Sequence, residues 1–519
     1  MLRSSLLAML LLGTSAYATQ PTKENVAKLY VATFERAPDS AGLDYWIYNS
    51  GLELEEIAQS FFDQPETQTK YPVGTENSAF ITSIYENLFN RAPDAAGLAY
   101  WDQQLQTGAF TKSQAILAIT NGAQDSASGN DLSMVANKTQ VGIAFADAGF
   151  NNVTDAKNFL AHVTDDDSTV AAALTAFYER APIAHPTRTQ AQLDAATVLS
   201  GDITSSMTLT KDKLYRISGT TKVKNGAVIT VEAGTVIFGV EGEDVLVFTK
   251  GTKIIADATV NEPVIFTSEV ALLNPSDAEA GQWGGLTILG QAPTNQANPH
   301  YEIDENDADY AFGGTNAHDN SGILRNVYVL NSGETIGTDL EINGLSLCGI
   351  GKGTVVENIY VENSSDDCIE VWGGTVDITN ATMKNCQDDS FDLDFGWSGT
   401  ATNIVVQQTE TAHAGFEISS GGSTPMTSGK IVNFVINKAN GSDEGGIYIK
   451  DDTTAPTFVN GFVTTYAADA ALNAKKAMTA TQKAAIAFKD VTLNNSTTTY
   501  GGAGATDAQQ RFEADDASY

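Results

Sequence analysis

Two acidic doublets are the residues of this sequence whose types and spacing most suggest chemistry. Asp366-Asp367 and Asp388-Asp389 stand 22 residues apart. Carboxylates held close together repel one another, so a fold tolerates them only if a cation binds, some of them take up protons, or water reaches them. Further carboxylates follow the doublets at short intervals, namely Glu370, Asp392, Asp394 and Glu417.

The first interpretation of these residues is a metal site. Carboxylate and backbone oxygens are the ligands that Ca²⁺ prefers, so we expect Ca²⁺ as the cofactor. The second interpretation is structural, with the aspartates at solvated turns, and the residue types leave both open. The predicted metal ligands are Asp366, Asp367, Glu370, Asp388, Asp389, Asp392, Asp394 and Glu417.

A repeated pattern indicates the elements that position these carboxylates. Its order is small, apolar, polar, apolar, and it recurs at intervals of 22, 25 and 31 residues. One turn of a three-faced solenoid of parallel strands requires such a period, with insertions in the loops. Equivalent residues of successive turns then lie about 4.8 Å apart, which stacks the doublets. The pattern occurs at Cys368-Ile369-Glu370-Val371, Ser390-Phe391-Asp392-Leu393, Gly415-Phe416-Glu417-Ile418 and Gly446-Ile447-Tyr448-Ile449.

Several glycine-rich and tryptophan-containing segments carry a resemblance to a known group of proteins. They are Gly281-Gln282-Trp283-Gly284-Gly285, Glu341-Ile342-Asn343-Gly344-Leu345, Glu370-Val371-Trp372-Gly373-Gly374-Thr375 and Phe395-Gly396-Trp397-Ser398-Gly399. Residues 205–420 resemble a large family of exported bacterial β-helix proteins. The resemblance implies a right-handed parallel β-helix, a pectate-lyase-like solenoid.

A third interpretation of the doublets is catalytic, and it comes from a weaker resemblance. Asn363 to Asp367, Gln387 to Ser390, Ala412 to Gly415 and Gly446 to Lys450 together resemble the motifs of polygalacturonase-type glycoside hydrolases. The resemblance implies that Asp366 or Asp367, with Asp388 and Asp389, supplies the acid and base, and that His413 and Lys450 bind an acidic sugar. Tyr448 stands where those enzymes carry an arginine, and alanines flank His413. We therefore favour a non-catalytic protein, with an acidic-polysaccharide hydrolase as the alternative.

The N-terminal part of the sequence contains a different repeat. The segment Phe34 to Trp46 returns as Phe89 to Trp101, offset by 55 residues, and both copies contain Arg-Ala-Pro-Asp and Gly-Leu-x-Tyr-Trp. Each copy predicts a helix, a Pro-Asp turn and a second helix. Residues 24–180 resemble the domain-of-unknown-function family 4214, which implies a helical attachment or interaction module. We expect Arg36 with Asp39, and Arg91 with Asp94, to form ion pairs that brace the turns.

Composition and the N-terminus indicate where the protein acts. Lys and Arg number 29 against 64 Asp and Glu, a net charge of −35 that excludes nucleic acid and anionic lipid as partners. The cationic start, short apolar run and Ala16-Tyr17-Ala18 predict a secretory signal peptide. No later segment is apolar over the ~20 residues that span a bilayer. The three cysteines, Cys348, Cys368 and Cys386, allow at most one disulfide.

These observations predict a multi-domain organisation with an all-α domain followed by a parallel β-helix. We expect a signal peptide at 1–18, a helical repeat-containing domain at 19–195, the β-helix at 205–465, and an Ala-rich helix, a last strand near Lys489 to Leu493 and a mobile tail within 466–519. The predicted function is a secreted or cell-surface structural or adhesive protein, S-layer-like or matrix-like, with an acidic Ca²⁺-binding face. Its expected partners are a cell-surface glycan, another envelope protein or further copies of itself.

Overall fold

The computed structural model describes most of the chain in two compact units, residues 1–173 and 174–519. The described residues are 21–122, 130–147, 152–166, 168–178, 185–304, 306–337, 340–408, 412–438, 444–465, 469–495 and 499–516. The predicted signal peptide, residues 1–18, lies outside them. Within the described part of the chain, no helix combines the length and the apolar composition that crossing a membrane requires.

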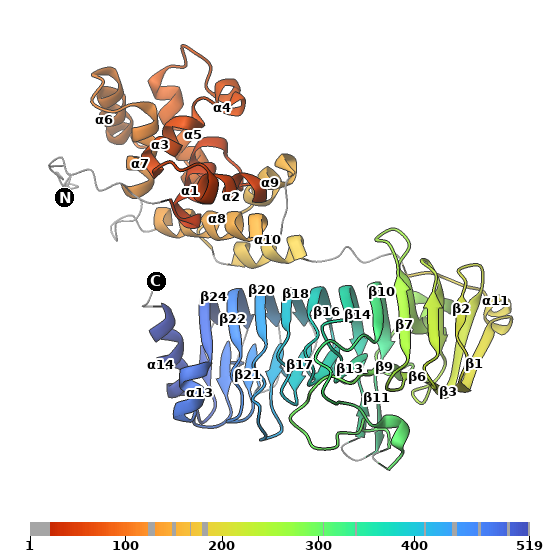
Figure 1. Ribbon diagram of the computed structural model, residues 1–519. Coiled ribbons are helices and arrows are strands. Elements are labelled where there is room, and N and C mark those ends of the chain that lie inside the picture. Colours follow the sequence, from red (N-terminus) through yellow and green to blue (C-terminus); the bar gives the residue numbers. More distant parts are fainter. Residues whose placement is uncertain are drawn as a thin grey trace. The chain divides into compact units, whose positions relative to one another are not determined.

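The first unit is helical, as predicted (Figure 1). Helix α10 continues past its boundary at residue 173. The elements are α1 (Lys23–Phe34), α2 (Ser40–Asp44), the π-helix η1 (Tyr45–Asn49), α3 (Leu54–Phe61), α4 (Pro65–Lys70), α5 (Asn77–Phe89), α6 (Ala95–Gln106), α7 (Lys112–Gly122), α8 (Asn130–Asp147), α9 (Val153–Leu160) and α10 (Ser168–Tyr178).

The two copies of the N-terminal repeat form the pairs α1/α2 and α5/α6. In each turn the aspartate caps the following helix: the Asp39 carboxylate accepts from the backbone N–H of Gly42 at 2.8 Å, and Asp94 does the same for Gly97 at 2.7 Å. The predicted ion pair between Arg36 and Asp39 is confirmed at 3.3 Å.

The second predicted turn-bracing pair is wrong. The Arg91 guanidinium pairs with Asp131 of α8 at 2.5 Å, while Asp94 serves as the helix cap. In both copies a helix from outside the repeat supplies a carboxylate to the arginine, since Glu66 of α4 lies 3.0 Å from Arg36. The copies differ because only Arg36 also pairs with the capping aspartate of its own turn.

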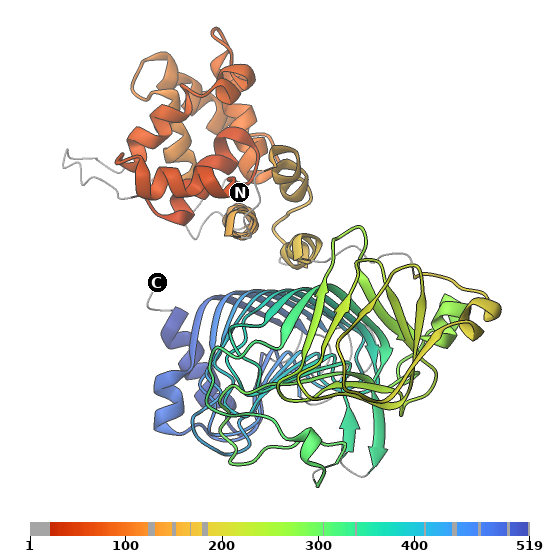
Figure 2. The same cartoon turned by 45° about the vertical axis from the view of Figure 1, so that its right-hand side comes forward.

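The second unit is a parallel β-helix in which each strand pairs with equivalent strands of the neighbouring coils. Figures 1 and 2 show the strands of successive coils lying side by side along the solenoid. A 23-stranded sheet contains all the strands except β11 and β12, which form a small antiparallel hairpin.

The elements of the first coils are α11 (Gln190–Asp194), β1 (Thr197–Ile203), β2 (Met207–Leu209), β3 (Leu214–Val223), β4 (Val228–Val231), β5 (Val236–Gly239), β6 (Val245–Phe248), β7 (Lys253–Asp257), β8 (Val264–Ser268), α12 (Glu269–Leu273), η2 (Pro275–Asp277) and β9 (Gly285–Leu289). They are followed by η3 (Ala308–Tyr310), β10 (Gly322–Ser332), β11 (Glu334–Gly337), β12 (Leu340–Ile342), β13 (Leu345–Cys348) and β14 (Val355–Ser364).

The later coils contain β15 (Ile369–Trp372), β16 (Ile378–Lys384), β17 (Phe391–Asp394), β18 (Thr400–Gln408), β19 (Phe416–Ile418), β20 (Lys430–Lys438), β21 (Ile447–Ile449), β22 (Thr457–Thr465), β23 (Leu472–Ala474), α13 (Ala480–Ala485), β24 (Ala487–Asn495), β25 (Tyr500–Gly501) and α14 (Ala505–Asp516).

The solenoid interior is filled by stacked apolar side chains. Every second residue of a strand points inward, so Ile369 and Val371 of β15 lie in the core with no exposed surface. A column of phenylalanines continues this core toward the C-terminus, with ring centroids 5.2–5.9 Å apart. Its members are Phe391, Phe416, Phe434, Phe458 and Phe488. Stacking of like residues in successive coils buries the apolar face that a single coil leaves open.

A column of asparagines runs along one edge of the solenoid, and the sequence analysis missed it. The first asparagine, Asn326, donates its Nδ2 to the carbonyl of Ala258 at 2.7 Å. Each later amide Nδ2 donates to the Oδ1 of the asparagine one coil earlier, at 2.8–3.1 Å. Each also has a φ between 52° and 59°, which asparagine tolerates better than most residues. The signal was present as an asparagine before a largely apolar segment, for example Asn326-Val327-Tyr328-Val329. The column, named here the asparagine ladder, contains Asn326, Asn358, Asn380, Asn403, Asn433 and Asn460.

The C-terminal end differs from the predicted organisation. The sheet continues past residue 465 through β23, β24 and β25, and the predicted last strand lies within β24. The predicted Ala-rich helix is present only as the short α13; before it, Leu472 and Ala474 are fully buried in a strand. Burial in the next coil outweighs the helix propensity of alanine. The predicted mobile tail contains α14, whose Phe512 packs 5.3 Å from Phe488 and covers the last coil.

Candidate functional site

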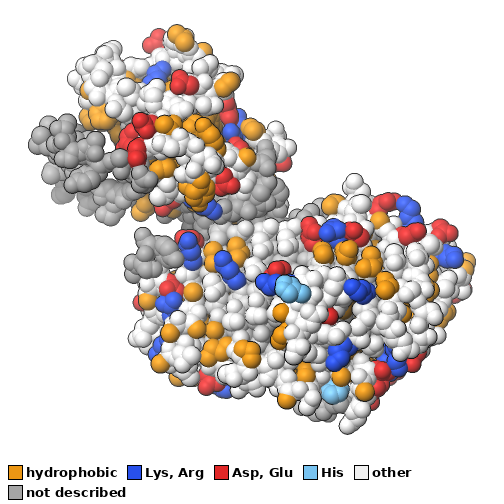
Figure 3. Space-filling view, in the orientation of Figure 1, with side chains coloured by type: hydrophobic (Ala, Val, Ile, Leu, Met, Phe, Trp, Pro, Cys, Tyr) orange, Lys and Arg blue, Asp and Glu red, His pale blue; other side chains and the backbone are white. Residues whose placement is uncertain are grey.

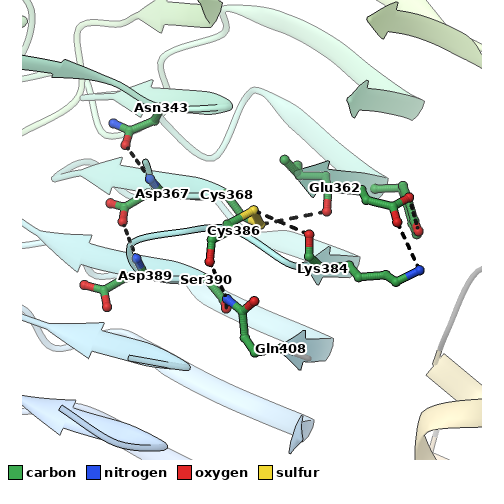
Figure 4. Close-up of a disulfide and its surroundings, with 11 residues drawn as sticks. Asn343, Glu362, Asp367, Cys368, Lys384, Cys386, Asp389, Ser390 and Gln408 are labelled. Carbon is green, nitrogen blue, oxygen red and sulfur yellow. Dashed lines mark hydrogen bonds and ion pairs between the residues drawn. A yellow bond between two sulfur atoms is a disulfide. The ribbon is translucent and has the colours of Figure 1, made fainter. Parts of the chain in front are cut away.

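The second residue of each acidic doublet lies in a column of turns. The backbone N–H of Asp367 donates to Oδ1 of Asn343 at 3.2 Å, and that of Asp389 donates to Oδ1 of Asp367 at 2.8 Å (Figure 4). The N–H of Ala414 donates in turn to Oδ1 of Asp389. One oxygen of each aspartate therefore joins successive coils, as the structural interpretation predicts. Asn343, missed as a site residue, precedes Asp367 by 24 positions at the same phase of the repeat.

A second column of carboxylates lies on the adjoining strands. Glu370 of β15, Asp392 of β17 and Glu417 of β19 are register partners. They alternate with core residues, so their side chains point outward from the sheet. Together with Asp367 and Asp389 they form what we call the acidic track. The stacking that the metal and hydrolase hypotheses both require is therefore present.

The carboxylates of the acidic track approach one another closely in two groups. Oxygens of Asp367, Glu370 and Asp392 lie within 4.8 Å of one another, and so do oxygens of Asp389, Asp392 and Glu417. Asp392 belongs to both groups. The two groups thus share one carboxylate.

The acidic track points outward but is covered, in contrast to the open face that the sequence predicts. Its five residues are each less than one-tenth exposed. The connection between β9 and β10 lies against this face: the hydroxyl of Tyr301 is 2.9 Å from that of Ser346, the register partner of Glu370. The Tyr301 and Trp372 rings pack 5.6 Å apart. On the face of the molecule shown in Figure 3, acidic side chains form small groups between basic and uncharged ones.

Burial dominates the electrostatics of the acidic track. Loss of hydration raises the pKa of Asp367, Glu370, Asp389 and Asp392 well above the usual carboxyl range, and neighbouring carboxylates raise it further. Burial and the nearby Glu341 raise the pKa of Asp366 to about 8. An ionised buried carboxylate without a counter-charge is costly. The track is therefore neutral where its carboxyl groups are protonated and needs a counter-charge where they are ionised.

One carboxylate oxygen of the acidic track has no hydrogen-bond partner among the described residues. Asp392 is 8% exposed, and its Oδ1 accepts no hydrogen bond from any described residue. Buried carboxylate oxygens in folded proteins are almost always hydrogen-bonded or bound to a cation. Because Asp392 belongs to both groups of carboxylates, an unpartnered oxygen on this residue marks it as the carboxylate with the greatest need of a counter-charge.

A basic side chain reaches the C-terminal end of the track. The Lys450 ammonium lies 2.6 Å from Oε1 of Glu417. Burial acts to lower the pKa of Lys450, but the Glu417 carboxylate outweighs it and the net shift is upward. Lys450 therefore stays charged, and the residue predicted to bind an acidic sugar forms an ion pair within the protein.

Asp388, the first residue of the second doublet, is more exposed than Asp389, whereas Asp366 is as buried as Asp367. Asp388 contacts Nδ1 of His413, which is also 3.6 Å from Glu444. The hydrogen bond to Asp388 raises the pKa of His413 to about 9, so the imidazole is a cation at neutral pH. Oxygens of Asp366, Asp388 and Glu341 form a further group within 4.8 Å. The structure therefore adds Glu341 and Glu444 to the predicted site residues.

Asp394 lies apart from these groups of carboxylates. Its Oδ1 accepts from the backbone N–H of Phe395 at 2.5 Å, and it belongs to none of the close groups found among the described residues. Its register partner is Trp372. The spacing of the sequence could not separate Asp394 from Asp392, because both point to the same face two positions apart.

A disulfide joins Cys368 and Cys386 beside the doublets (Figure 4). Cys368 directly follows Asp367, and Cys386 comes two residues before Asp388. The disulfide therefore links the segment that carries the first acidic doublet to the segment just before the second doublet. Cys348 is the remaining thiol and is buried.

Comparisons with known proteins agree with this architecture. A model of the pectate-lyase-like beta helix domain matches residues 201–518, and a model of a domain of unknown function, DUF4214, matches residues 58–127. No curated protein and no solved structure gives a significant match. The first match spans more than half of the chain and includes every residue of the acidic track. The chain therefore belongs to the family of proteins with a pectate-lyase-like β-helix domain.

Proposed function

We propose that this protein is an exported, structural or adhesive β-helix protein whose acidic track binds a divalent cation, with Ca²⁺ the best candidate. The observation that carries the proposal is Oδ1 of Asp392, a buried carboxylate oxygen that accepts no hydrogen bond from the described residues. A divalent cation beside it would neutralise the track and replace repulsion by attraction.

The ligand chemistry favours Ca²⁺ over softer metals. The group of Asp367, Glu370 and Asp392 offers carboxylate oxygens alone, and hard cations prefer oxygen. Ca²⁺ binds oxygens at about 2.3–2.6 Å, so two ligands on opposite sides of the ion lie at most about 5.2 Å apart. Oxygens within 4.8 Å of one another meet this limit.

The same geometry argues against the hydrolase alternative. Inverting hydrolysis needs two carboxyl groups roughly 6.5–9.5 Å apart with a water between them. Oxygens of Asp367, Asp388 and Asp389 lie within 4.8 Å of one another. Asp367 and Asp389 are also buried and bonded to backbone N–H groups. These features suit a bound ion better than a glycan and an attacking water.

A role at the cell surface follows from the architecture and the predicted export. A solenoid of this kind offers a long surface, and the helical unit carries a repeat typical of attachment modules. We propose a surface glycan, another envelope protein or further copies of the chain as partners. Binding of the purified protein to cell-envelope fragments, measured with Ca²⁺ and with chelator, tests this role. Binding that is absent under both conditions contradicts it.

Calorimetric titration with Ca²⁺ tests the cation site directly. We expect saturable binding to the wild type, loss of that binding in Asp392→Asn, and normal binding in Asp212→Asn. Asp212 is an exposed carboxylate of the same β-helix and serves as the matched control. Absence of binding to the wild type, or equal binding to Asp392→Asn, contradicts the proposal.

A further inference from the structure

The two carboxylate groups of the acidic track differ in the cation available to them. Asp367 and Glu370 form the first group with Asp392, and Asp389 and Glu417 form the second. The Lys450 ammonium lies against the second group, 2.6 Å from Glu417. Among the described residues, no lysine or arginine forms an ion pair with Asp367 or Glu370, the two carboxylates that belong to the first group alone.

Lys450 belongs to the coil that follows the second group of carboxylates. It comes directly after β21, and its backbone N–H donates to the carbonyl of Ile418 at 3.0 Å. Its backbone is therefore fixed one coil beyond Glu417, while its side chain folds back toward that carboxylate and remains 46% exposed. The ammonium thus places a positive charge against Glu417, one of the three carboxylates of the second group.

We propose that the acidic track contains two cation subsites and that Lys450 fills the second with its own ammonium. The first subsite consists of Asp367, Glu370 and Asp392, and the second of Asp389, Asp392 and Glu417. The inference rests on the proposed function, because it assumes that the first subsite takes a divalent cation. Lys450 then limits the protein to one bound metal ion per chain, and its ammonium neutralises the second subsite without metal.

The next coil provides a matched control for Lys450. Ile449 and Ala474 are register partners, so Lys475 occupies the position equivalent to Lys450 one coil later. The Lys475 ammonium lies 5.9 Å from the centre of the ring of Tyr448, the register partner of Glu417 one coil later. Removing its charge alters the same surface of the β-helix without opening either subsite.

Calorimetric titration with Ca²⁺ alone, on the full chain, tests the inference. We expect one bound ion per chain in the wild type, in Lys450→Arg and in Lys475→Met, and two in Lys450→Met. One ion in Lys450→Met, or two in the wild type, overturns the inference while the proposed function stands. No ion in the wild type overturns the proposed function as well.

A second measurement applies even if Lys450→Met does not fold. Amine-reactive labelling of the folded wild type, loaded with one equivalent of Ca²⁺ and read by mass spectrometry, compares Lys450 with Lys475. We expect Lys450 to react at least several-fold more slowly, because its ammonium is held against Glu417. Equal reaction rates overturn the inference.

Discussion

Two polar columns run along the same solenoid, and they solve the problem of stacking identical groups in different ways. In the asparagine ladder each side chain donates to one neighbour and accepts from the other. An amide can do both, whereas an ionised carboxylate only accepts. In the acidic track, Glu370, Asp392 and Glu417 are stacked by the same register, but they cannot bond to one another without a proton or a cation.

The column of turns that contains Asp367 and Asp389 shows a third arrangement, in which aspartate has a structural role. Asp367 and Asp389 each receive a backbone N–H from the next coil. Asp392 Oδ1 receives no hydrogen bond from the described residues. The comparison therefore separates the aspartates that have a structural role from Asp392, where we propose that a cation binds.

The largest effect is expected from breaking the asparagine ladder. Asn403→Ala removes two amide hydrogen bonds and places alanine at a φ of 59°. We expect a loss of about 3 kcal/mol in the free energy of unfolding, from unpaired buried amides and left-handed backbone strain. Urea denaturation measures it, with the exposed Asn261→Ala as control. A loss no larger than the control's contradicts the structural role of the ladder.

The acidic track should respond to Ca²⁺ where the ladder does not. At a free Ca²⁺ concentration 100 times the dissociation constant, binding to the native state adds about 2.7 kcal/mol of stability. We expect this gain in the wild type and in Asn403→Ala, and its absence in Asp392→Asn. Thermal denaturation with Ca²⁺ and with chelator measures the difference. Equal midpoints for the wild type under both conditions remove the metal hypothesis.

Removing the central carboxylate should stabilise the metal-free protein. Asp392→Asn replaces an acceptor by a group that can also donate, and it relieves repulsion by Glu417. We expect about 1 kcal/mol of added stability in chelator, the opposite sign to Asn403→Ala. A decrease in stability would show that the Asp392 carboxylate already has a favourable partner.

The titratable residues beside the acidic track should make stability depend on pH, whereas the amides of the asparagine ladder do not titrate. The folded-state pKa of Asp366 is about 8, above its ordinary value of 3.8, so its contribution is full below about pH 4 and is lost as pH rises through 8. His413, with a folded pKa of about 9, acts in the same direction. Without Ca²⁺, the melting temperature should fall between pH 5 and pH 8. Added Ca²⁺ should restore more stability at pH 8, since it competes with fewer protons.

The smallest expected effect belongs to the hydrolase alternative. We expect no new reducing ends from polyuronides or neutral glycans, and therefore no difference between the wild type and Asp388→Asn. Release of reducing ends by the wild type that disappears in Asp388→Asn would replace the metal hypothesis by the catalytic one.

The sequence by itself determined the class of fold and the stacking of the carboxylates. Strand alternation and a period in the low twenties can be satisfied together only by coils in register, and this places Glu370, Asp392 and Glu417 in one column. The helical repeat could also be predicted from the sequence, because its Pro-Asp turns and helix caps depend only on residues close together in the chain. The same reasoning could have found the asparagine ladder from its repeated segments.

Only the tertiary structure decided which carboxylates have partners. The covering of the track by the connection that carries Tyr301, the approach of Lys450 to Glu417 and the pairing of Arg91 with Asp131 all join segments of unrelated sequence. Such contacts depend on loop paths and on side-chain reach between coils, which periodicity does not encode. The continuation of the sheet through the Ala-rich segment was decided in the same way, because burial against the preceding coil outweighed local helix propensity.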